Sequence, residues 1–480
     1  MAAIPSDIFF ATIPEINSRL KAKEFSAVEL TRAFSDRLEK LGPRYNAVAL
    51  SLREDADRRA RQVASDLKRD RTRGPLQGIP CGVKDLLSIA NRPTTWGAPP
   101  YAGQVFDYDA SAVKKLESAR AIIIAKLAMV ELAGGPGYRF ANASLTGAGL
   151  NPWDRTRWSG GSSSGSGIAV AAGLVTFALG SETSGSILTP SAYCGVTGLR
   201  PTYGLVSRHG AMALSWTLDK IGPICRTAED CGLVLQAIAG GDHNDPGSAG
   251  KSFYYAPQYG RAMKDIVVGY SPADFSDGVD PAARADFGKA VETVKAFGVK
   301  IKEVSLPDFP YGPLVNVIMS AEAASVFEPL IESGKVDELI DKLQIAGLRA
   351  GLEISAKDYL KAMRVRSLLQ DAFRELFADV DVLLAPSRPG PAPSISQPLD
   401  QLPSTRQPDS PRGLNGIIPA GNLAGLPAIS LPCGFADHLP IAISFVGNPF
   451  SENLLLRLGS EFQSHTDWHR RHPPMPETKG

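Results

Sequence analysis

Nine consecutive residues at positions 159–167, SGGSSSGSG, are all serine or glycine, and an apolar run over 168–179 follows directly. A flexible linker would explain such a composition. Chain that leads straight into a segment that must be buried cannot move freely, so this run is not a linker. Glycines allow backbone shapes that other residues rarely adopt, and amide groups at the start of a helix can face an anion. We therefore predict a helix over 168–179 with a functional loop at its start.

Helix and strand patterns alternate along most of the chain. Ser26 and Glu29 form a capping box, and the apolar residues after them recur at helical spacing up to Leu41. The apolar run from Ile79 predicts a strand that places Lys84 at its end. Alternation of this kind is typical of an α/β fold. The same patterns predict further helices over 51–70, 114–119 and 282–297, and further strands over 121–125, 265–270, 299–305 and 380–385.

Composition argues against several classes of protein. The 480 residues include 51 Lys and Arg against 50 Asp and Glu, and this net charge of +1 argues against bulk electrostatic binding to nucleic acid or to an acidic membrane. The five cysteines show neither the even count of a disulfide framework nor the spacing of a zinc site. The N-terminal residues lack the basic and apolar segments of a secretory signal. We therefore expect a cytoplasmic protein with reduced thiols and no bound metal.

The serine and glycine run also contains G-x-S-x-G, the nucleophile elbow of α/β-hydrolases, over residues 161–165. In that interpretation Ser163 is the nucleophile, and a histidine late in the chain, His438 or His465, is its base. An elbow follows an apolar strand, whereas the residues before position 161 are NPWDRTRWSG. We therefore keep Ser163 only as an alternative nucleophile.

Four separate blocks of sequence resemble the amidase signature family. They are GIPCGVKD at 78–85, NPWD and then SGGSSSGSG within 151–167, GSETSGSILTPSAYCGVTGLRPTYGLVS at 180–207, and NLAGLPAISLPCGF at 422–435. The blocks stand in the family's order and reach across nearly the whole chain. The resemblance implies one domain over residues 1–480 with the amidase signature fold, in which helices flank both faces of a mixed, twisted central sheet.

The resemblance also implies a Ser–cis-Ser–Lys triad. Lys84 would be the base, Ser162 the bridging serine and Ser186 the nucleophile. Burial of Lys84 at a strand end would lower its pKa and favour the neutral amine. That amine could accept a proton from Ser186 through Ser162 and so activate the nucleophile.

Further site residues follow from the same resemblance. The backbone N–H groups of Thr183, Ser184 and Gly185, with that of Ser186, would form the oxyanion hole. Gly134 aligns with a loop that lines the substrate pocket in this family. The mechanism requires no metal and no organic cofactor.

We expect a free-standing hydrolase that cleaves the C–N bonds of small or aryl amides through an acyl-enzyme on Ser186. Carbamates (urethanes) and esters share this acyl-carbonyl chemistry and are expected as further substrates. The expected partners are these small molecules, without nucleic acid or membrane, and the chain itself is expected as a monomer or homodimer. The helices and the loop within 310–415 are expected to shape substrate entry.

Two other functions stay open. Members of this family also form the glutaminase-type A subunit of a tRNA-dependent amidotransferase, and a non-catalytic binding protein could use the same fold. Leu188 stands where the family commonly has arginine, and Ser184 replaces a glycine. The leucine weighs against the amidotransferase reading, whereas retention of Lys84, Ser162 and Ser186 weighs against a binding protein.

Overall fold

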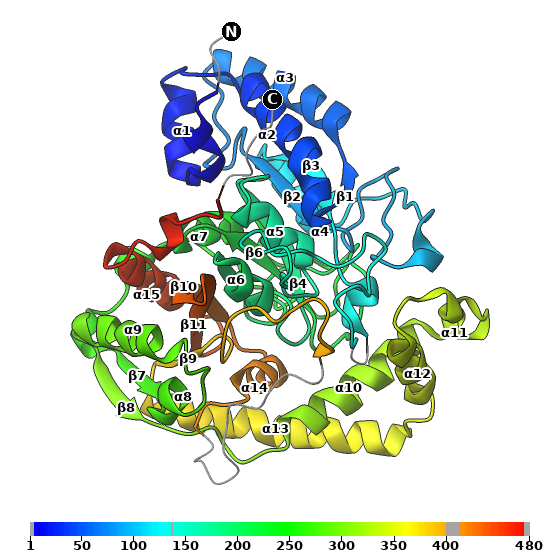
Figure 1. Cartoon of the computed structure of the whole chain (residues 1–480), viewed down its shortest axis with the longest axis vertical. Helices are drawn as coiled ribbons and strands as arrows, with labels where there is room; N and C mark the ends of the chain where they lie inside the picture. The colour runs from blue at the N-terminus through cyan, green and yellow to red at the C-terminus, as the bar shows by residue number, and fades with distance from the viewer. Residues whose placement is uncertain (1–3, 136–137, 400–412, 475–480) are drawn as a thin grey trace.

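The computed structural model of the chain describes residues 4–135, 138–399 and 413–474 (Figure 1). Across these residues, eleven strands form one sheet in the order β1-β3-β2-β4-β6-β5-β10-β11-β9-β7-β8. Strands β3, β2 and β4 are parallel neighbours, as are β9, β7 and β8, and the remaining pairs are antiparallel. The predicted α/β fold with a mixed, twisted sheet is confirmed. The strands are β1 (Val48–Ser51), β2 (Pro80–Lys84), β3 (Ile122–Leu127), β4 (Phe177–Glu182), β5 (Thr197–Arg200), β6 (Lys220–Cys225), β7 (Val267–Tyr270), β8 (Lys300–Glu303), β9 (Val382–Pro386), β10 (Ala428–Ala436) and β11 (Leu439–Gly447).

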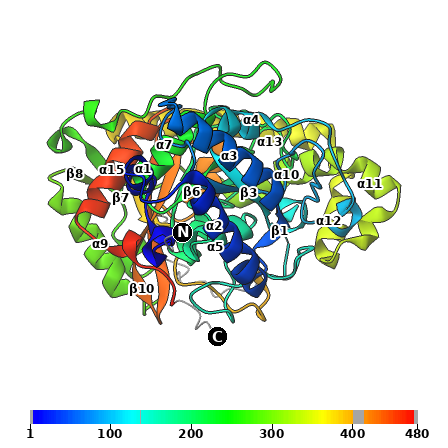
Figure 2. The same ribbon diagram turned by 90° about the horizontal axis from the view of Figure 1, so that it is seen from above.

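Helices cover both faces of this sheet (Figures 1 and 2). A Cβ at Gly198 of β5 would lie 2.8 Å from the Cβ of Ser191 in α6, and one at Gly459 of α15 would lie 3.2 Å from Ile429. Gly198 pairs with Ser430, the residue after Ile429, and successive residues of a strand face opposite sides. Helices α6 and α15 therefore pack on opposite faces. The α-helices are α1 (Ile13–Lys21), α2 (Ala27–Leu41), α3 (Arg53–Lys68), α4 (Ser111–Ser118), α5 (Ser164–Ala171), α6 (Leu188–Cys194), α7 (Ala228–Ile238), α8 (Ala273–Ser276), α9 (Arg284–Ala296), α10 (Tyr311–Val326), α11 (Glu328–Glu332), α12 (Lys342–Gly351), α13 (Ala356–Asp379), α14 (Ile417–Ala424) and α15 (Glu452–Ser464).

Local sequence chemistry explains the start of α2. The Ser26 side chain accepts a hydrogen bond from the backbone N–H of Glu29, and the Glu29 carboxylate accepts one from the backbone N–H of Ser26. This reciprocal pair satisfies two amide groups that have no partner inside the helix. The apolar residues that recur at helical spacing, among them Leu30 and Phe34, are fully buried. The predicted capping box and its amphipathic helix are both confirmed.

The predicted helix over 168–179 is wrong in its second half. Helix α5 begins earlier, at Ser164 within the serine and glycine run, and ends at Ala171. Gly173 then turns the chain with φ +65°, a conformation that glycine adopts readily, and Arg37 donates hydrogen bonds to its carbonyl group and to the preceding one. The chain continues as β4 from Phe177. A fully buried helix and a fully buried strand both appear uniformly apolar, so the sequence pattern could not separate them.

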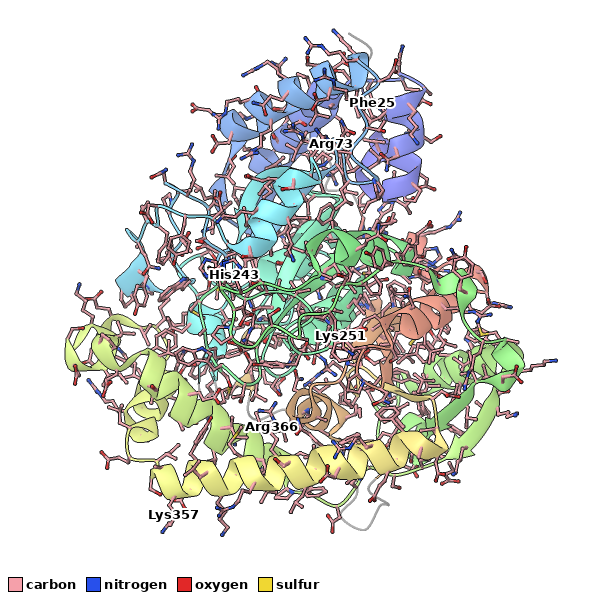
Figure 3. The ribbon with its side chains drawn as sticks, turned by 180° about the vertical axis from the view of Figure 1, so that it is seen from behind. Phe25, Arg73, His243, Lys251, Lys357 and Arg366 are labelled. Atoms are coloured by element: carbon pink, nitrogen blue, oxygen red, sulfur yellow. The ribbon has the colours of Figure 1, made fainter. Side chains whose placement is uncertain are left out.

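Helices α10 to α13 form the helical part of the 310–415 region. Figure 2 shows α11 and α12 at one end of the molecule and β7 and β8 at the other. In Figure 3, Arg366 lies on the inward side of α13 and Lys357 on the opposite side. Arg366 donates hydrogen bonds to the carbonyl groups of Leu423 in α14 and of Thr217, which fix α13 to the sheet side of the molecule. The part of the proline-rich loop at 400–412 lies outside the described residues.

Within the part of the chain that the structure describes, no helix combines the length and the apolar character that crossing a bilayer requires.

Candidate active site

Lys84 is the last residue of β2 and lies at the carboxyl end of the parallel strands. Its side chain is fully buried, and its Nζ donates hydrogen bonds to Ser162 Oγ at 2.7 Å and to Ser181 Oγ at 2.9 Å. Ser181 belongs to β4, the parallel neighbour of β2. The carboxyl ends of neighbouring parallel strands meet at one edge of a sheet, which is where α/β folds bind their ligands.

Burial lowers the pKa of Lys84 to about 7, while the charges of Asp219 and Glu182 act in the opposite direction. A lysine with this pKa is neutral in about half of the molecules near pH 7. Only the neutral amine can accept a proton, so Lys84 has the protonation behaviour that a general base needs.

The serine and glycine run supplies the two serines that follow Gly161. The peptide bond between Gly161 and Ser162 is cis, and both Ser162 and Ser163 are fully buried. The Ser163 hydroxyl donates to the carbonyl oxygen of Ser181 at 3.1 Å and accepts from its N–H at 3.2 Å. Ser163 therefore joins the run to β4 by hydrogen bonds.

Neither histidine of the nucleophile-elbow alternative acts on Ser163. His438 lies 3.5 Å from Asp154, and His465 contacts Ser464 and Glu461 through its ring nitrogen. The structure thus argues against an elbow built on Ser163.

Ser186 lies in the turn between β4 and α6 and is nearly buried, with 9% of its surface exposed. Its carbonyl oxygen accepts a hydrogen bond of 3.3 Å from the backbone N–H of Ser163, so this turn adjoins the serine and glycine run. Among the described residues, none accepts a hydrogen bond from the amide groups of Thr183, Ser184, Gly185 or Ser186. Four successive N–H groups are therefore free to face an oxyanion.

A buried carboxylate fixes the turn that carries these amide groups. Glu182 accepts hydrogen bonds from the N–H groups of Ile187 and Leu188 through Oε2, and from Arg200 and Asn422 through Oε1. Burial acts to raise the pKa of Glu182, but the Arg200 charge and the Asn422 hydrogen bond bring it below its ordinary value. Arg200, which is also fully buried, thus supplies the positive charge beside this turn. The Leu188 side chain instead packs in an apolar cluster.

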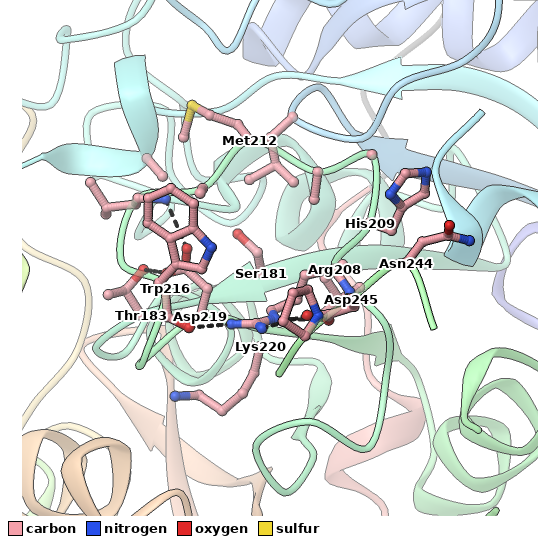
Figure 4. Close-up of a pocket in the computed structure, with 18 residues that line it drawn as sticks. Ser181, Thr183, Arg208, His209, Met212, Trp216, Asp219, Lys220, Asn244 and Asp245 are labelled. Carbon is pink, nitrogen blue, oxygen red and sulfur yellow. Dashed lines mark hydrogen bonds and ion pairs between the residues drawn. The ribbon is translucent and has the colours of Figure 1, made fainter. Parts of the chain in front are cut away.

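A cavity of about 230 Å³ has in its lining Ser181, which accepts a hydrogen bond from Lys84 (Figure 4). Ser181, Thr183 and Asp219 line it together with Ala133. Asp219 accepts hydrogen bonds from the Thr183 hydroxyl at 2.5 Å and from the N–H groups of Leu214 and Ser215. Sequence reasoning missed both Ser181 and Asp219. The position of Ser181 at the end of a strand, two residues before Thr183, could have indicated the first, but no sequence pattern marked the second.

Gly134 lies under an aromatic ring beside the serine and glycine run. It ends a short 3-10 helix, η4 (Glu131–Gly134), with φ +99°, and a Cβ there would lie 2.5 Å from the ring of Tyr138. The same tyrosine reaches Gly161, where a Cβ would lie 2.9 Å from its hydroxyl oxygen. Tyr138 therefore packs against both Gly134 and Gly161, the residue before Ser162. The sequence analysis did not single out Tyr138.

In residues 4–135, 138–399 and 413–474, no group of three or more His, Cys, Asp or Glu side chains is placed to hold a metal ion.

A buried lysine contacts two serines at the carboxyl end of the parallel strands. This sheet and this site define the class of the protein: an enzyme that acts on the carbon–nitrogen bonds of amides. The chain belongs to the Amidase family, whose sequence model matches residues 29–456. The resemblance to amidase signature enzymes is confirmed.

Individual relatives share most of the chain. The A subunit of the glutamyl-tRNA(Gln) amidotransferase of Carboxydothermus hydrogenoformans is 36% identical over 98% of this chain and 100% of the relative. The solved structure of a protein of the same name from Thermotoga maritima covers 100% of both chains, with a TM-score of 0.81 and 28% identity. A structure from work on the origins of an s-triazine catabolic enzyme covers 95% of this chain and 98% of its own, with a TM-score of 0.85 and 29% identity.

The main function and the partners that we expected from sequence are wrong. We expected a free-standing hydrolase of small or aryl amides, carbamates and esters, without nucleic acid and as a monomer or homodimer. The relatives from Carboxydothermus and Thermotoga are instead named as subunits of an amidotransferase, and that name includes a tRNA. The expectation weighed Leu188 against such a role, but this side chain is 1% exposed among apolar neighbours, so its identity reports on packing.

Proposed function

We propose that this chain is the glutaminase-type A subunit of a tRNA-dependent amidotransferase. It hydrolyses the side-chain amide of glutamine, and partner subunits use the released ammonia. The observation that carries the proposal is the hydrogen bond of 2.7 Å between Lys84 and Ser162 inside a fully buried site. The Amidase family supports amide chemistry at this site, and the name of a relative 36% identical over nearly the whole chain, an amidotransferase A subunit, supports the amidotransferase role.

In the proposed mechanism Lys84 is the base, Ser162 the bridging serine and Ser186 the nucleophile. Neutral Lys84 takes the Ser162 proton as Ser162 takes that of Ser186, and the Ser186 oxygen attacks the amide carbon. Breakdown of the tetrahedral intermediate breaks the C–N bond, and Ser162 returns a proton to the leaving nitrogen, which departs as ammonia. Water then attacks the ester on Ser186 by the same proton path and releases the carboxylic acid.

The remaining site residues receive roles in the same proposal. The N–H groups of Thr183 to Ser186 bind the oxyanion, and their lack of partners among the described residues supports this role. Gly134 lines the substrate site and allows Tyr138 to pack closely. Helices α10 to α13 shape substrate entry within one domain over the whole chain. Gln344 of α12 supports this role, because its side chain would contact a Cβ at Gly135 at 2.8 Å.

A cytoplasmic location belongs to the proposal as well. All five cysteines are buried free thiols, and unpaired thiols are typical of a reducing compartment.

The test is to tag the chain, purify it from cells that encode it and measure ammonia release from glutamine. We expect other subunits to co-purify with the wild-type chain, and we expect ammonia release that Ser186→Ala abolishes. Ser118→Ala, on the exposed face of α4, is the control and should retain the activity. A chain that purifies alone and leaves glutamine intact, while a fluorophosphonate still labels Ser186, would overturn the proposal.

A further inference from the structure

Arg388 carries a positive charge that no described side chain balances. It follows β9 and is half-buried, and its Nε donates a hydrogen bond of 3.3 Å to the hydroxyl of Tyr193. Within the described ranges, no aspartate or glutamate forms an ion pair with Arg388. Other inward-facing arginines have strong acceptors: Arg200 pairs with a carboxylate at 2.8 Å, and Arg366 donates to two backbone carbonyls. The terminal nitrogens of Arg388 are therefore available to a ligand.

An aromatic cluster begins at this cation. The guanidinium carbon lies 5.9 Å from the ring centre of Tyr193, whose ring lies 6.3 Å from that of Trp158, and Trp158 lies 5.8 Å from Tyr138. Trp158 is 5% exposed, and its indole N–H is buried without a hydrogen-bond partner among the described residues. A buried donor without a partner is costly. The guanidinium and the unpaired indole N–H belong to one cluster, linked through Tyr193, and each is a donor that an anion can satisfy.

The cluster reaches the reacting groups through Tyr138. The Tyr138 hydroxyl would lie 2.9 Å from a Cβ at Gly161, and the Trp158 ring would lie 3.0 Å from the same point. Gly161 is bonded to Ser162, which accepts the Lys84 hydrogen bond. Tyr138 and Trp158 therefore connect the cluster around Arg388 to the residue next to Ser162.

The chain that holds Arg388 is itself fixed beside the site. Trp158 donates its backbone N–H to the carbonyl oxygen of Pro393 at 2.8 Å, and Ile395 donates to that of Thr156 at 3.0 Å. These bonds join the segment after β9 to the residues just before the serine and glycine run. A substrate-binding group held by such bonds is pre-organised, which lowers the entropy lost on binding.

We propose that Arg388 binds the carboxylate of the substrate and thereby selects amides that carry a carboxylate at the far end of a short aliphatic chain. The inference rests on the proposed function, since glutamine is such an amide. A guanidinium presents two parallel N–H groups that match a carboxylate. Tyr138 and Trp158 provide apolar surface for the methylene groups between the carboxylate and the amide. A neutral aryl amide lacks a carboxylate that could pair with the Arg388 guanidinium, so we expect it to bind less well.

The test measures protection of Ser186 from a neutral fluorophosphonate, a readout that needs no turnover. The competitors are glutamine, glutaramate, which keeps the carboxylate but lacks the amino group, and pentanamide, which lacks both. We expect glutaramate to protect the wild type at a concentration about 10- to 100-fold below that of pentanamide, the effect of one charge-assisted contact. Arg388→Met should remove this preference, and Arg388→Lys should restore part of it. The control is Ser118→Ala on the exposed face of α4, which should keep both the labelling rate without competitor and the preference for glutaramate.

The outcomes separate this inference from the proposed function. Equal protection by glutaramate and pentanamide in the wild type, or a preference that survives Arg388→Met, would overturn the role of Arg388. Glutamine hydrolysis that continues with an unchanged KM in Arg388→Met would leave the glutaminase proposal standing and refute only this inference. Preference for glutaramate that depends on Arg388, in a chain that does not hydrolyse glutamine, would support the carboxylate site and refute the glutaminase.

Discussion

The protonation of Lys84 predicts how the reactivity of Ser186 depends on pH. Burial lowers the pKa of this lysine from 10.5 to about 7, which corresponds to a penalty of about 5 kcal/mol on the charged form. In the proposed mechanism, the reactive fraction is the one in which Lys84 is neutral. It amounts to roughly a tenth at pH 6, about half at pH 7 and roughly nine tenths at pH 8. An unperturbed lysine would be neutral in only about one molecule in three thousand at pH 7.

The perturbation that tests this account is Asp219→Asn. The negative charge of Asp219 acts to raise the pKa of Lys84, so its removal should lower that pKa and move the acid limb to lower pH. The control is Asp245→Asn. Asp245 lines the same cavity but pairs with Arg208 and is not among the charges that shift the pKa of Lys84.

The assay is the rate of labelling of Ser186 by a fluorophosphonate from about pH 5 to about pH 9. We expect the wild-type rate to rise with pH around a midpoint near 7, the value set by the burial of Lys84 and the charges around it. Asp219→Asn should shift the midpoint downward, and Asp245→Asn should leave it in place. A rate that does not depend on pH, or an Asp219→Asn midpoint above that of the wild type, would refute the reasoning.

Three further predictions concern single residues. Gly134→Ala should lower stability by about 1–3 kcal/mol in thermal unfolding, because its φ of +99° is strained for other residues; Gly103→Ala, with open space around it, should be neutral. Arg200→Met should cost about 3–5 kcal/mol by leaving Glu182 buried and unpaired, and a melting temperature close to that of the wild type would contradict this. Ser181→Ala removes one of the two hydrogen bonds that hold the Lys84 amine in place and should slow labelling about 10- to 100-fold at a pH where the amine is neutral in both proteins, whereas Ser181→Thr should restore most of the rate.

Much of the fold could be predicted from local sequence patterns, and the predictions that failed did so for a physical reason. The capping box of Ser26 and Glu29 is read from a few neighbouring residues, and the structure contains it. The apolar run from Ile79 likewise predicted the strand that ends at Lys84, and β2 ends at that residue. The run over 168–179 failed because burial on all sides removes the periodicity that separates a helix from a strand. Only the turn at Gly173, which Arg37 holds from α2, divides it.

In the candidate site, too, sequence patterns identified residues within short motifs and missed residues that lie far from those motifs along the chain. The motifs named Lys84, Ser162 and Ser186 because each lies in a short, distinctive block. Asp219 lies 33 residues after the last of them and Arg388 much further, and no motif marks either residue. The weight placed on Leu188 misled the choice of function, because a sequence cannot show that a side chain points into an apolar cluster.

By itself, the sequence determined the class of fold, the family and the order of the chemical groups, since these depend on residue types and on spacing along the chain. The tertiary structure alone decided which charges act on each other. It buries Lys84 beside Ser162 and Ser181, pairs Glu182 with Arg200 and leaves Arg388 without a carboxylate among the described residues. Electrostatic interactions depend on distance through space and on exclusion of water, and residues far apart in the chain acquire both only when the sheet brings them together.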